Sequence, residues 1–401
     1  MSYTRPAFEV AHIIGRYRHS LEGRGKLTSH QKKVFTNLQQ CRTAALGYHK
    51  DKCDNPECGY EHISFNSCRN RHCPKCNGLK REKWVQTRIG DLLPVKYYHV
   101  VFTVPESLNG LFLAKPALIY NQLFESVWQT IRKFASDPKY LGAKTGMIAI
   151  LHSWGQNLSL HPHIHCLVPA GGITKNNEWR HTRCEGKFLF PVKALSKVFR
   201  GIFTDALVDL HRKGEIHLET PFIPDKKYLH PLYKKRWVVY AKLPMHNALQ
   251  VVNYIGKYTH RIAISNHRIQ SVENNRVKFS AFDYRTSKVV QVDLTAEEFL
   301  RRFSLHILPR GFMKIRHYGI LSSRAKTLAL ACARKSLGAA NPKSEIARDR
   351  SWQQWLIELY GKDVLLCPQC KTGKMMLVAV CYPRSRGSPH DGVSRYLTLA
   401  S

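Results

Sequence analysis

Apolar side chains near the start of the chain recur at helical spacing. They fall every three or four positions at Phe8, Val10, Ile13, Ile14 and Tyr17, which is the pattern of one buried helical face. Further along, Thr28 and Gln31 have the spacing of a capping box that opens a second helix. We therefore predict packing helices with basic exteriors within residues 7–47.

The middle of the chain alternates between strand-like and helix-like patterns. Runs rich in β-branched and aromatic residues, typical of strands, occupy 97–105, 147–154, 163–168 and 237–241. Amphipathic helical patterns cover 117–135 and the region near 192–213. Sheet runs mixed with helices in this way indicate an α+β domain with a largely antiparallel sheet.

The run His161-Pro-His-Ile-His165 lies in one of these strands. Alternate side chains of a strand share a face, so His163 and His165 should point into one pocket. His161 would join them only if the strand already runs straight through Pro162. Two imidazoles at this spacing can hold a divalent metal. A histidine-rich surface strand is the alternative for a lone pair of this kind.

Composition narrows the class of partner. The 401 residues include 63 Lys and Arg against 28 Asp and Glu, a formal charge of +35, and 43% of the chain is hydrophobic. A chain with a full core and this charge is expected to bind a polyanion. No apolar run is long enough to span a bilayer, which disfavours a membrane partner. The first residues lack the pattern of a signal peptide.

Twelve cysteines in a chain without that signal favour metal binding over disulfides. Two close pairs, Cys53 with Cys58 and Cys73 with Cys76, are separated by 14 residues, the pattern of a zinc ribbon with four thiolate ligands. We predict one structural Zn²⁺ held by these four, with a short strand near residues 60–65. The alternative ligands Cys68 and His72 lie between the pairs.

A further pair, Cys367 and Cys370, resembles a second zinc knuckle. Its partner pair is missing from the neighbouring sequence, where Cys381 and His390 are the nearest candidate ligands. A half-site of this kind is more often without metal.

A second cluster with candidate chemistry lies at residues 251–261. On a helix, Tyr254 and Tyr258 are four positions apart and share a face, and Lys257 lies beside Tyr254. A phenol is a poor nucleophile at neutral pH, and a nearby ammonium lowers its pKa or stabilises charge on a phosphate. Taken alone, two tyrosines at this spacing are more often packing residues.

The histidine strand and the tyrosine cluster together resemble the HUH endonucleases, which nick single-stranded DNA through a 5′-phosphotyrosine. The doubled tyrosine and the cysteine-rich N-terminus are similar to the two-tyrosine rolling-circle transposases of insertion sequences, of the IS91 type with an N-terminal zinc-binding domain. The resemblance covers roughly residues 10–380, and its most specific stretches are 101–104, 154–166, 254–265 and 306–319.

The resemblance implies an HUH-type antiparallel sheet with flanking helices, preceded by helices and a small zinc ribbon. It implies that His163 and His165 bind a catalytic Mg²⁺ or Mn²⁺, which polarises the scissile phosphate. The third ligand in the family is often a carboxylate or an amide outside the histidine pair. Gln156 fits that role, and His161 is its rival.

The resemblance also implies that Tyr254 or Tyr258 attacks the phosphate, leaving a free 3′-OH that can prime synthesis, with Lys257 as the third catalytic residue. Tyr254 and Lys257 match the family pattern Tyr-x-x-Lys, so we expect Tyr254 to make the first cleavage. The second tyrosine would serve a later strand transfer.

The expected partners are single-stranded DNA at element ends and target sites and the host replication machinery, in a bacterial cytoplasm near the nucleoid. Basic residues predicted to contact DNA are Arg69, Arg71, Lys75, Lys80, Arg81, Lys234, Lys235, Arg236 and Arg316. For several of them a solvated basic face is the alternative.

Four regions follow from these patterns. They are a helical and zinc-ribbon DNA-binding domain at 1–90, a nuclease domain at 91–300, a basic region with the candidate knuckle at 301–382 and a disordered tail at 383–401. Two other functions stay open: a non-catalytic zinc-ribbon protein that binds nucleic acid, and a hydrolase in which the histidine-bound metal activates water. A covalent protein–DNA adduct would separate the transposase from both.

Overall fold

The structure is a computed structural model of the 401-residue chain. It describes residues 6–76, 78–186, 188–216, 232–233, 237–242, 250–251, 256, 262–283, 286–340, 351–361, 363–382 and 396–398. Among these residues, no helix combines the length and the apolar character needed to cross a bilayer.

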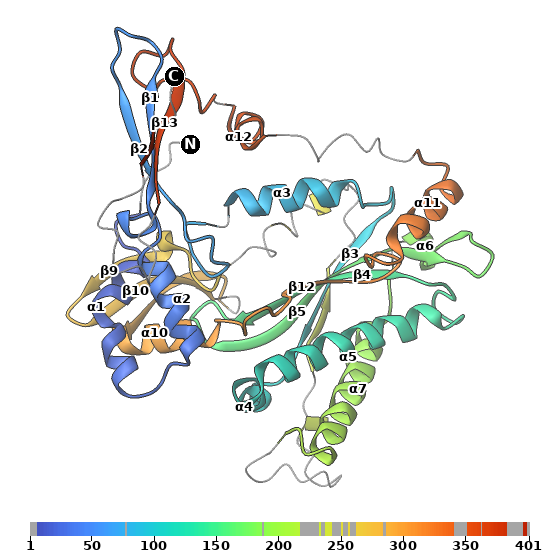
Figure 1. The fold of residues 1–401 in the computed structure, drawn as a ribbon. Helices are drawn as coiled ribbons and strands as arrows, with labels where there is room; N and C mark the ends of the chain where they lie inside the picture. Colours follow the sequence, from blue (N-terminus) through green and yellow to red (C-terminus); the bar gives the residue numbers. More distant parts are fainter. Residues whose placement is uncertain are drawn as a thin grey trace.

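A five-stranded antiparallel sheet forms the centre of the molecule (Figure 1). Its order is β12-β4-β5-β3-β8, with bounds Ile315–Gly319, Gly146–Trp154, Leu160–Pro169, Tyr97–Thr103 and Val239–Ala241. The predicted α+β class with a largely antiparallel sheet is confirmed. The four predicted strands match β3, β4, β5 and β8, and a fifth strand, β12, joins the edge of the sheet beside β4.

Helices cover both faces of this sheet, as Figure 1 shows for α5 and α7 below it and α3 above it. One apolar face, which includes Ala149 and Ile164, packs in one core with α5 (Pro116–Ser136) and α7 (Val192–Arg212). The opposite face packs with α3 (Gly78–Ile89) and α11 (Lys326–Ser336) through Ile148, Ile150, Leu167, Val85 and Leu330. Because side chains alternate along a strand, odd and even positions of β4 enter different cores.

The N-terminal helices pack on a second, smaller sheet. α1 (Val10–Gly23) and α2 (Ser29–Gln39) share a hydrophobic core with α10 (Ala296–Leu305) and the sheet β11-β10-β9. Those strands have the bounds Lys288–Thr295, Arg276–Asp283 and Ile269–Glu273. The predicted capping box is confirmed, because the Thr28 side chain accepts from the Gln31 amide and the Gln31 side chain accepts from the Thr28 amide.

A third sheet joins the two ends of the chain. Its order is β14-β13-β1-β2, with bounds Tyr396–Thr398, Met375–Cys381, Tyr48–Cys53 and Glu61–Phe65. The predicted short strand near 60–65 is β2. Strand β13 pairs with β1, so the structure links segments that the sequence assigns to separate regions, 1–90 and 301–382. Within the tail predicted to be disordered, β14 pairs with β13.

Shorter elements complete the described fold. They are the turns η1 (Ala44–Leu46), η2 (Glu106–Leu108) and η3 (Asn266–Arg268), the helices α4 (Asn109–Ala114), α6 (Arg183–Gly186) and α12 (Trp352–Tyr360), and the paired strands β6 (Gly171–Ile173) and β7 (Trp179–His181).

The last residue of β12 is a glycine for a steric reason. Gly319 has a φ of +59°, and a Cβ built there would lie 2.1 Å from the Thr145 carbonyl oxygen and 2.7 Å from the Trp128 ring. Gly311 has a φ of +74° but no atom within 4 Å of such a Cβ. A side chain at Gly311 would therefore meet backbone strain alone, whereas one at Gly319 would meet both strain and a steric clash.

We predict that Gly311→Ala lowers the free energy of unfolding by about 1–2 kcal/mol, the cost of the left-handed conformation for a residue with a Cβ. Gly319→Ala should cost at least about 3 kcal/mol, because overpacking against backbone adds to that strain. Thermal and urea unfolding followed by circular dichroism measures both. Equal losses for the two variants would contradict the close approach of β12 to Thr145.

Candidate functional site

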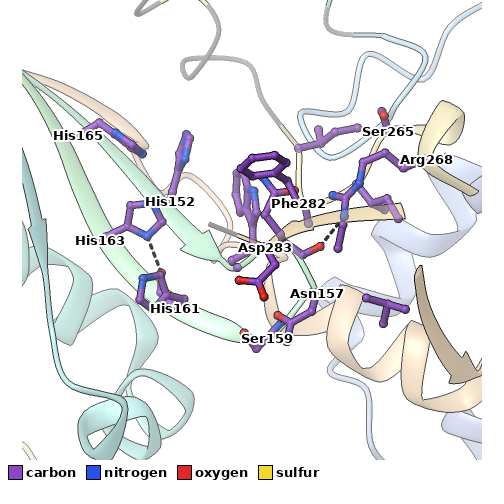
Figure 2. Close-up of a pocket in the computed structure, with 18 of the residues that line it drawn as sticks. His152, Asn157, Ser159, His161, His163, His165, Ser265, Arg268, Phe282 and Asp283 are labelled. Atoms are coloured by element: carbon purple, nitrogen blue, oxygen red, sulfur yellow. Dashed lines mark hydrogen bonds between the residues drawn. The ribbon is translucent and has the colours of Figure 1, made fainter. Parts of the chain in front are cut away.

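Three histidines from two neighbouring strands meet at one end of the central sheet. His163 and His165 project from the same face of β5, as their spacing predicts. The antiparallel register places His152 of β4 opposite His163. One ligand atom from each of the three rings lies within 4.8 Å of the others. Figure 2 shows the three rings together on one wall of a cavity.

Two contacts orient the rings of the predicted pair. The His163 Nδ1 lies 2.6 Å from the His161 carbonyl oxygen, so Nδ1 carries the proton and donates, and Nε2 is left with a lone pair. The Nδ1 of His165 lies 2.8 Å from the Nε2 of His99. If His165 donates this bond, its own Nε2 is also left with a lone pair. A neighbour that holds a ring nitrogen in this way positions a metal-binding histidine.

Burial lowers the pKa of two histidines at this site, His163 and its neighbour His99. Desolvation lowers the pKa of His163 to about 4. Desolvation, with a smaller contribution from the charge of Lys242, lowers the pKa of His99 to about 4. Neutral imidazole is the form that binds metals, so His163 can accept a divalent cation at pH 7 without losing a proton first.

The histidines line a cavity of about 1250 Å³. This exceeds the roughly 300–1,000 Å³ of pockets that bind small molecules, so the volume favours a larger ligand. The opposite wall comes from the three-stranded sheet and the segment before it, with Ser265, Arg268, Phe282 and Asp283 (Figure 2). In Figure 2, the Asp283 carboxylate extends from β10 into the space between the histidines and Arg268. Arg81 of α3 also lines the cavity.

The two residues predicted to compete for the third ligand position, Gln156 and His161, both line this cavity. His161 is exposed, and it lies outside the group of three histidines. The Gln156 backbone carbonyl accepts a hydrogen bond from Arg268. Its role as a ligand stays a prediction. The structure adds His152 as a third imidazole that the sequence reasoning missed, although it lies inside the predicted strand 147–154.

The predicted nucleophile region is only partly described. Tyr254, Lys257 and Tyr258 lie outside the described residues. Next to them, Val251 is fully buried in the same core as Val85 of α3. A Cβ built on Gly256 would lie 2.5 Å from a methyl carbon of Val85. Val251 and Gly256 therefore pack closely on α3, the helix that also presents Arg81 to the cavity.

The residues predicted to bind DNA have different environments. Arg81 lines the cavity and pairs with Glu82 at 2.5 Å. Arg69 is exposed. Arg71 donates to the Phe312 carbonyl at 2.6 Å, and Lys75 pairs with the buried Glu9 at 2.8 Å. These contacts position Arg71 and Lys75 within the fold.

Arg316 is also held within the protein, where its guanidinium lies 4.2 Å from the centre of the Phe124 ring and donates to Asn121. The Lys80 side chain and all of Lys234, Lys235 and Arg236 lie outside the described residues. DNA binding by the predicted set stays a prediction. Arg268, which the sequence reasoning missed, adds a second guanidinium to the cavity wall.

The predicted four-cysteine site is corrected by the structure, which divides its members between two clusters. Cys73 and Cys76 group with Cys41 and Cys68. Cys76 Sγ lies 3.3 Å from that of Cys41 and 3.7 Å from that of Cys68, and the sulfurs of Cys73 and Cys41 are 3.5 Å apart. Of the two alternative ligands, Cys68 joins this cluster and His72 does not. Cys41, which follows α2, was not considered.

The other pair of the predicted site meets the C-terminal knuckle. Cys53 and Cys58 group with Cys367 and Cys370. The expectation that the knuckle lacks a partner pair is therefore wrong, because its partners lie more than 300 residues earlier in the chain. Local spacing identified each pair, whereas the pairing of one with another depends on which strands meet in the sheet.

Comparisons with known proteins match two regions of the chain. Residues 146–328 match a family described as "Putative transposase", and residues 13–104 match the "Transposase zinc-binding domain". The first range holds the histidine cluster, and the second holds Cys41, Cys68, Cys73 and Cys76. This match and the cysteine clusters support structural zinc.

Two curated relatives are similar over most of their lengths. "Putative transposase y4qJ" of Sinorhizobium fredii is 41% identical over 388 residues, covering 93% of this chain and 95% of the relative. "Transposase for insertion sequence element IS801" of Pseudomonas savastanoi pv. phaseolicola is 26% identical over 333 residues, covering 81% and 78%. No solved structure matches this one.

The geometry predicts which residue is the third metal ligand. His152→Ala should weaken Mn²⁺ binding at least tenfold, because it removes one of three imidazoles from the cluster. Gln156→Ala, the matched control from the same cavity wall, should change the affinity less than threefold. Titration of the full-length protein followed by electron paramagnetic resonance measures free Mn²⁺ directly. A larger loss for Gln156→Ala than for His152→Ala would reverse the assignment.

Proposed function

The chain belongs to the IS91-type transposases with an N-terminal zinc-binding domain, and we propose that it nicks and rejoins single-stranded DNA at element ends through a 5′-phosphotyrosine intermediate. The family acts on DNA, which agrees with the formal charge of +35. The observation that carries the mechanism is the cluster of three imidazoles on the wall of a cavity larger than a small-molecule pocket.

The donor set of this cluster fits a divalent transition metal. Imidazole ligands disfavour Mg²⁺, which takes oxygen ligands in a strict octahedral geometry, more than they disfavour Mn²⁺. We therefore propose Mn²⁺ as the metal that supports activity best, with His152, His163 and His165 as its protein ligands. When bound, the metal polarises a non-bridging oxygen of the scissile phosphate and stabilises the charge of the transition state.

The proposed cleavage is a transesterification that conserves the number of phosphate ester bonds. The Tyr254 hydroxyl oxygen forms a bond to phosphorus, and the bond between phosphorus and the 3′ oxygen breaks. The phenol loses its proton, and the leaving 3′ oxygen gains one to become a 3′-OH. Lys257, three positions away, would stabilise the phenolate or the phosphate charge. Attack by a 3′-OH on the phosphotyrosine reverses the step and joins a new strand.

Other side chains in the cavity are suited to hold the strand. Arg81 and Arg268 lie on the walls and can pair with phosphates without reading the sequence. Phe282 is 37% exposed and lines the cavity opposite the histidines. An exposed ring in this position can stack on an unpaired base, an interaction that a duplex does not offer. We therefore propose that the cavity takes single-stranded rather than double-stranded DNA.

The first test identifies the nucleophile. With labelled single-stranded element ends and Mn²⁺, the protein should form a covalent adduct that survives denaturation, and mass spectrometry of the linked peptide should place the DNA on Tyr254. Tyr254→Phe should lose this adduct, because it removes the attacking oxygen and keeps the ring. Tyr258→Phe should form the adduct and fail at the later strand transfer.

His163→Ala serves as the control for metal dependence and should bind the strand normally without forming the adduct. An adduct located only on Tyr258 would reverse the order of the tyrosines. Absence of any adduct from a protein that binds the strand would favour the non-catalytic binding protein. Release of a cleaved strand that is never protein-linked would favour the hydrolase.

The second test uses the contact between Gly256 and Val85 of α3. Gly256→Ala places a methyl group where Val85 now lies, and we expect it to slow adduct formation at least tenfold because a displacement of about 1 Å at a reacting group can cost a hundredfold in rate. Val85→Ala in the same chain removes the obstructing methyl groups and should restore most of the rate.

Measured single-turnover rates of the two single variants and the double variant give the coupling between the positions. Additive effects, with no recovery in the double variant, would show that the packing of Gly256 on Val85 does not position the nucleophile. Binding of the strand, measured separately, should be equal in all three variants.

A further inference from the structure

The second cysteine cluster joins the two ends of the chain, and we infer that it binds a Zn²⁺ that clamps the C-terminal strand β13 to the N-terminal zinc-binding domain. The sulfurs of Cys53 and Cys370 are 3.7 Å apart, as are those of Cys58 and Cys367. In a tetrahedral site with Zn–S bonds of about 2.3 Å, neighbouring sulfurs lie about 3.8 Å apart. A disulfide would bring them to about 2.05 Å, so the spacing is that of metal ligands.

Each half of the site is a tight turn that points its sulfurs inward. In the first half, the Cys58 amide donates to the Asn55 carbonyl at 3.0 Å. In the second, the Lys371 amide donates to the Cys367 carbonyl at 3.0 Å, and the Gly373 amide donates to the Cys370 sulfur at 3.3 Å. An amide that donates to the sulfur stabilises a thiolate, the form that binds the metal.

At position 373 the two halves of the site lie too close together to leave room for a side chain. A Cβ built on Gly373 would lie 2.5 Å from the Cys53 sulfur. Strand pairing sets this distance, because β1 and β13 are antiparallel with Cys53 opposite Met375. Two further hydrogen bonds join the strands at the end of the ladder. The Asp54 amide donates to the Lys374 carbonyl at 2.9 Å, and the Lys374 amide donates to the Asp54 carboxylate at 2.7 Å.

The sheet around this site has little apolar burial of its own. Ile63, Phe65, Met376 and Leu377 are all at least 40% exposed. Within the described part of the chain, the three hydrophobic cores contain no residue of β1, β2 or β13. A small unit that lacks a core depends on a metal or another cross-link for stability. The Zn²⁺ is therefore the main link that holds β13 in place.

The consequence is that the zinc-binding domain includes residues that its family match, 13–104, leaves out. Cys58 and Cys367 are separated by 309 positions, so the loss of either half-site should release the other. Four thiolates select Zn²⁺ over Mg²⁺ or Mn²⁺. The site does not depend on the nicking chemistry proposed above, and it can be tested in protein that is catalytically inactive.

The first experiment counts zinc in the full-length chain by mass spectrometry of the metal. It uses the His163→Ala, His165→Ala background, so that the histidine cluster contributes no zinc. We expect two Zn²⁺ per chain, one after Cys370→Ser, and one after Cys76→Ser, which opens the other cluster. Cys332→Ser is the matched control, because Cys332 lies in neither cluster, and should keep two.

One Zn²⁺ in the parent background, two after Cys370→Ser, or iron in place of zinc would overturn the inference. If the Cys370→Ser chain fails to fold, the site is tested instead in protein that keeps all its cysteines. There, Cys58 and Cys370, both half-buried, should resist alkylation until a zinc chelator is added, whereas the exposed Cys184 reacts throughout. Alkylation of Cys58 and Cys370 at the Cys184 rate before chelation would also overturn it.

The second experiment tests the clamp itself by hydrogen exchange. Cys58→Ser lies in the N-terminal half-site, and we expect it to speed amide exchange in β13, Met375–Cys381, at least tenfold. Cys76→Ser, which opens the other cluster, should leave β13 protected. Unchanged protection of β13 in Cys58→Ser would show that strand pairing alone holds the C-terminal segment.

Discussion

The antiparallel register between β4 and β5 is the constraint on which the candidate site depends. It sets His152 opposite His163 and directs both rings, with His165, to one face. A slip of one residue would turn every side chain of β5 to the opposite face, sending the histidines into the apolar core and Ile164 to the cavity. Both faces of these strands are covered, so this register is strongly specified by the burial of apolar side chains.

The same burial gives the histidines their chemistry. His99 and His165 are almost completely buried, and a 2.8 Å hydrogen bond links their rings. Desolvation lowers the pKa of His99 and of His163 to about 4, so both are neutral at pH 7, the form that suits metal binding. The hydrophobic sheet thus supplies the geometry of the cluster and keeps His163 neutral.

The parts of the molecule are stabilised in different ways. The central sheet and the N-terminal helices have large apolar cores, whereas the sheet formed by β1, β2 and β13 exposes much of its apolar surface and has a cysteine cluster at its end. A hydrophobic core tolerates many substitutions that conserve volume. A four-thiolate site loses its metal when one ligand changes, which makes that sheet the more sensitive unit.

Local patterns in the sequence determined the α+β class, the capping box at Thr28 and the shared face of His163 and His165, because helical and strand periodicities act over a few residues. They also identified each close cysteine pair. Only the tertiary structure decided that His152 completes the histidine cluster and that Cys53 and Cys58 meet a pair more than 300 residues away. Those contacts depend on strand register and on which strands become neighbours, and no local spacing encodes either.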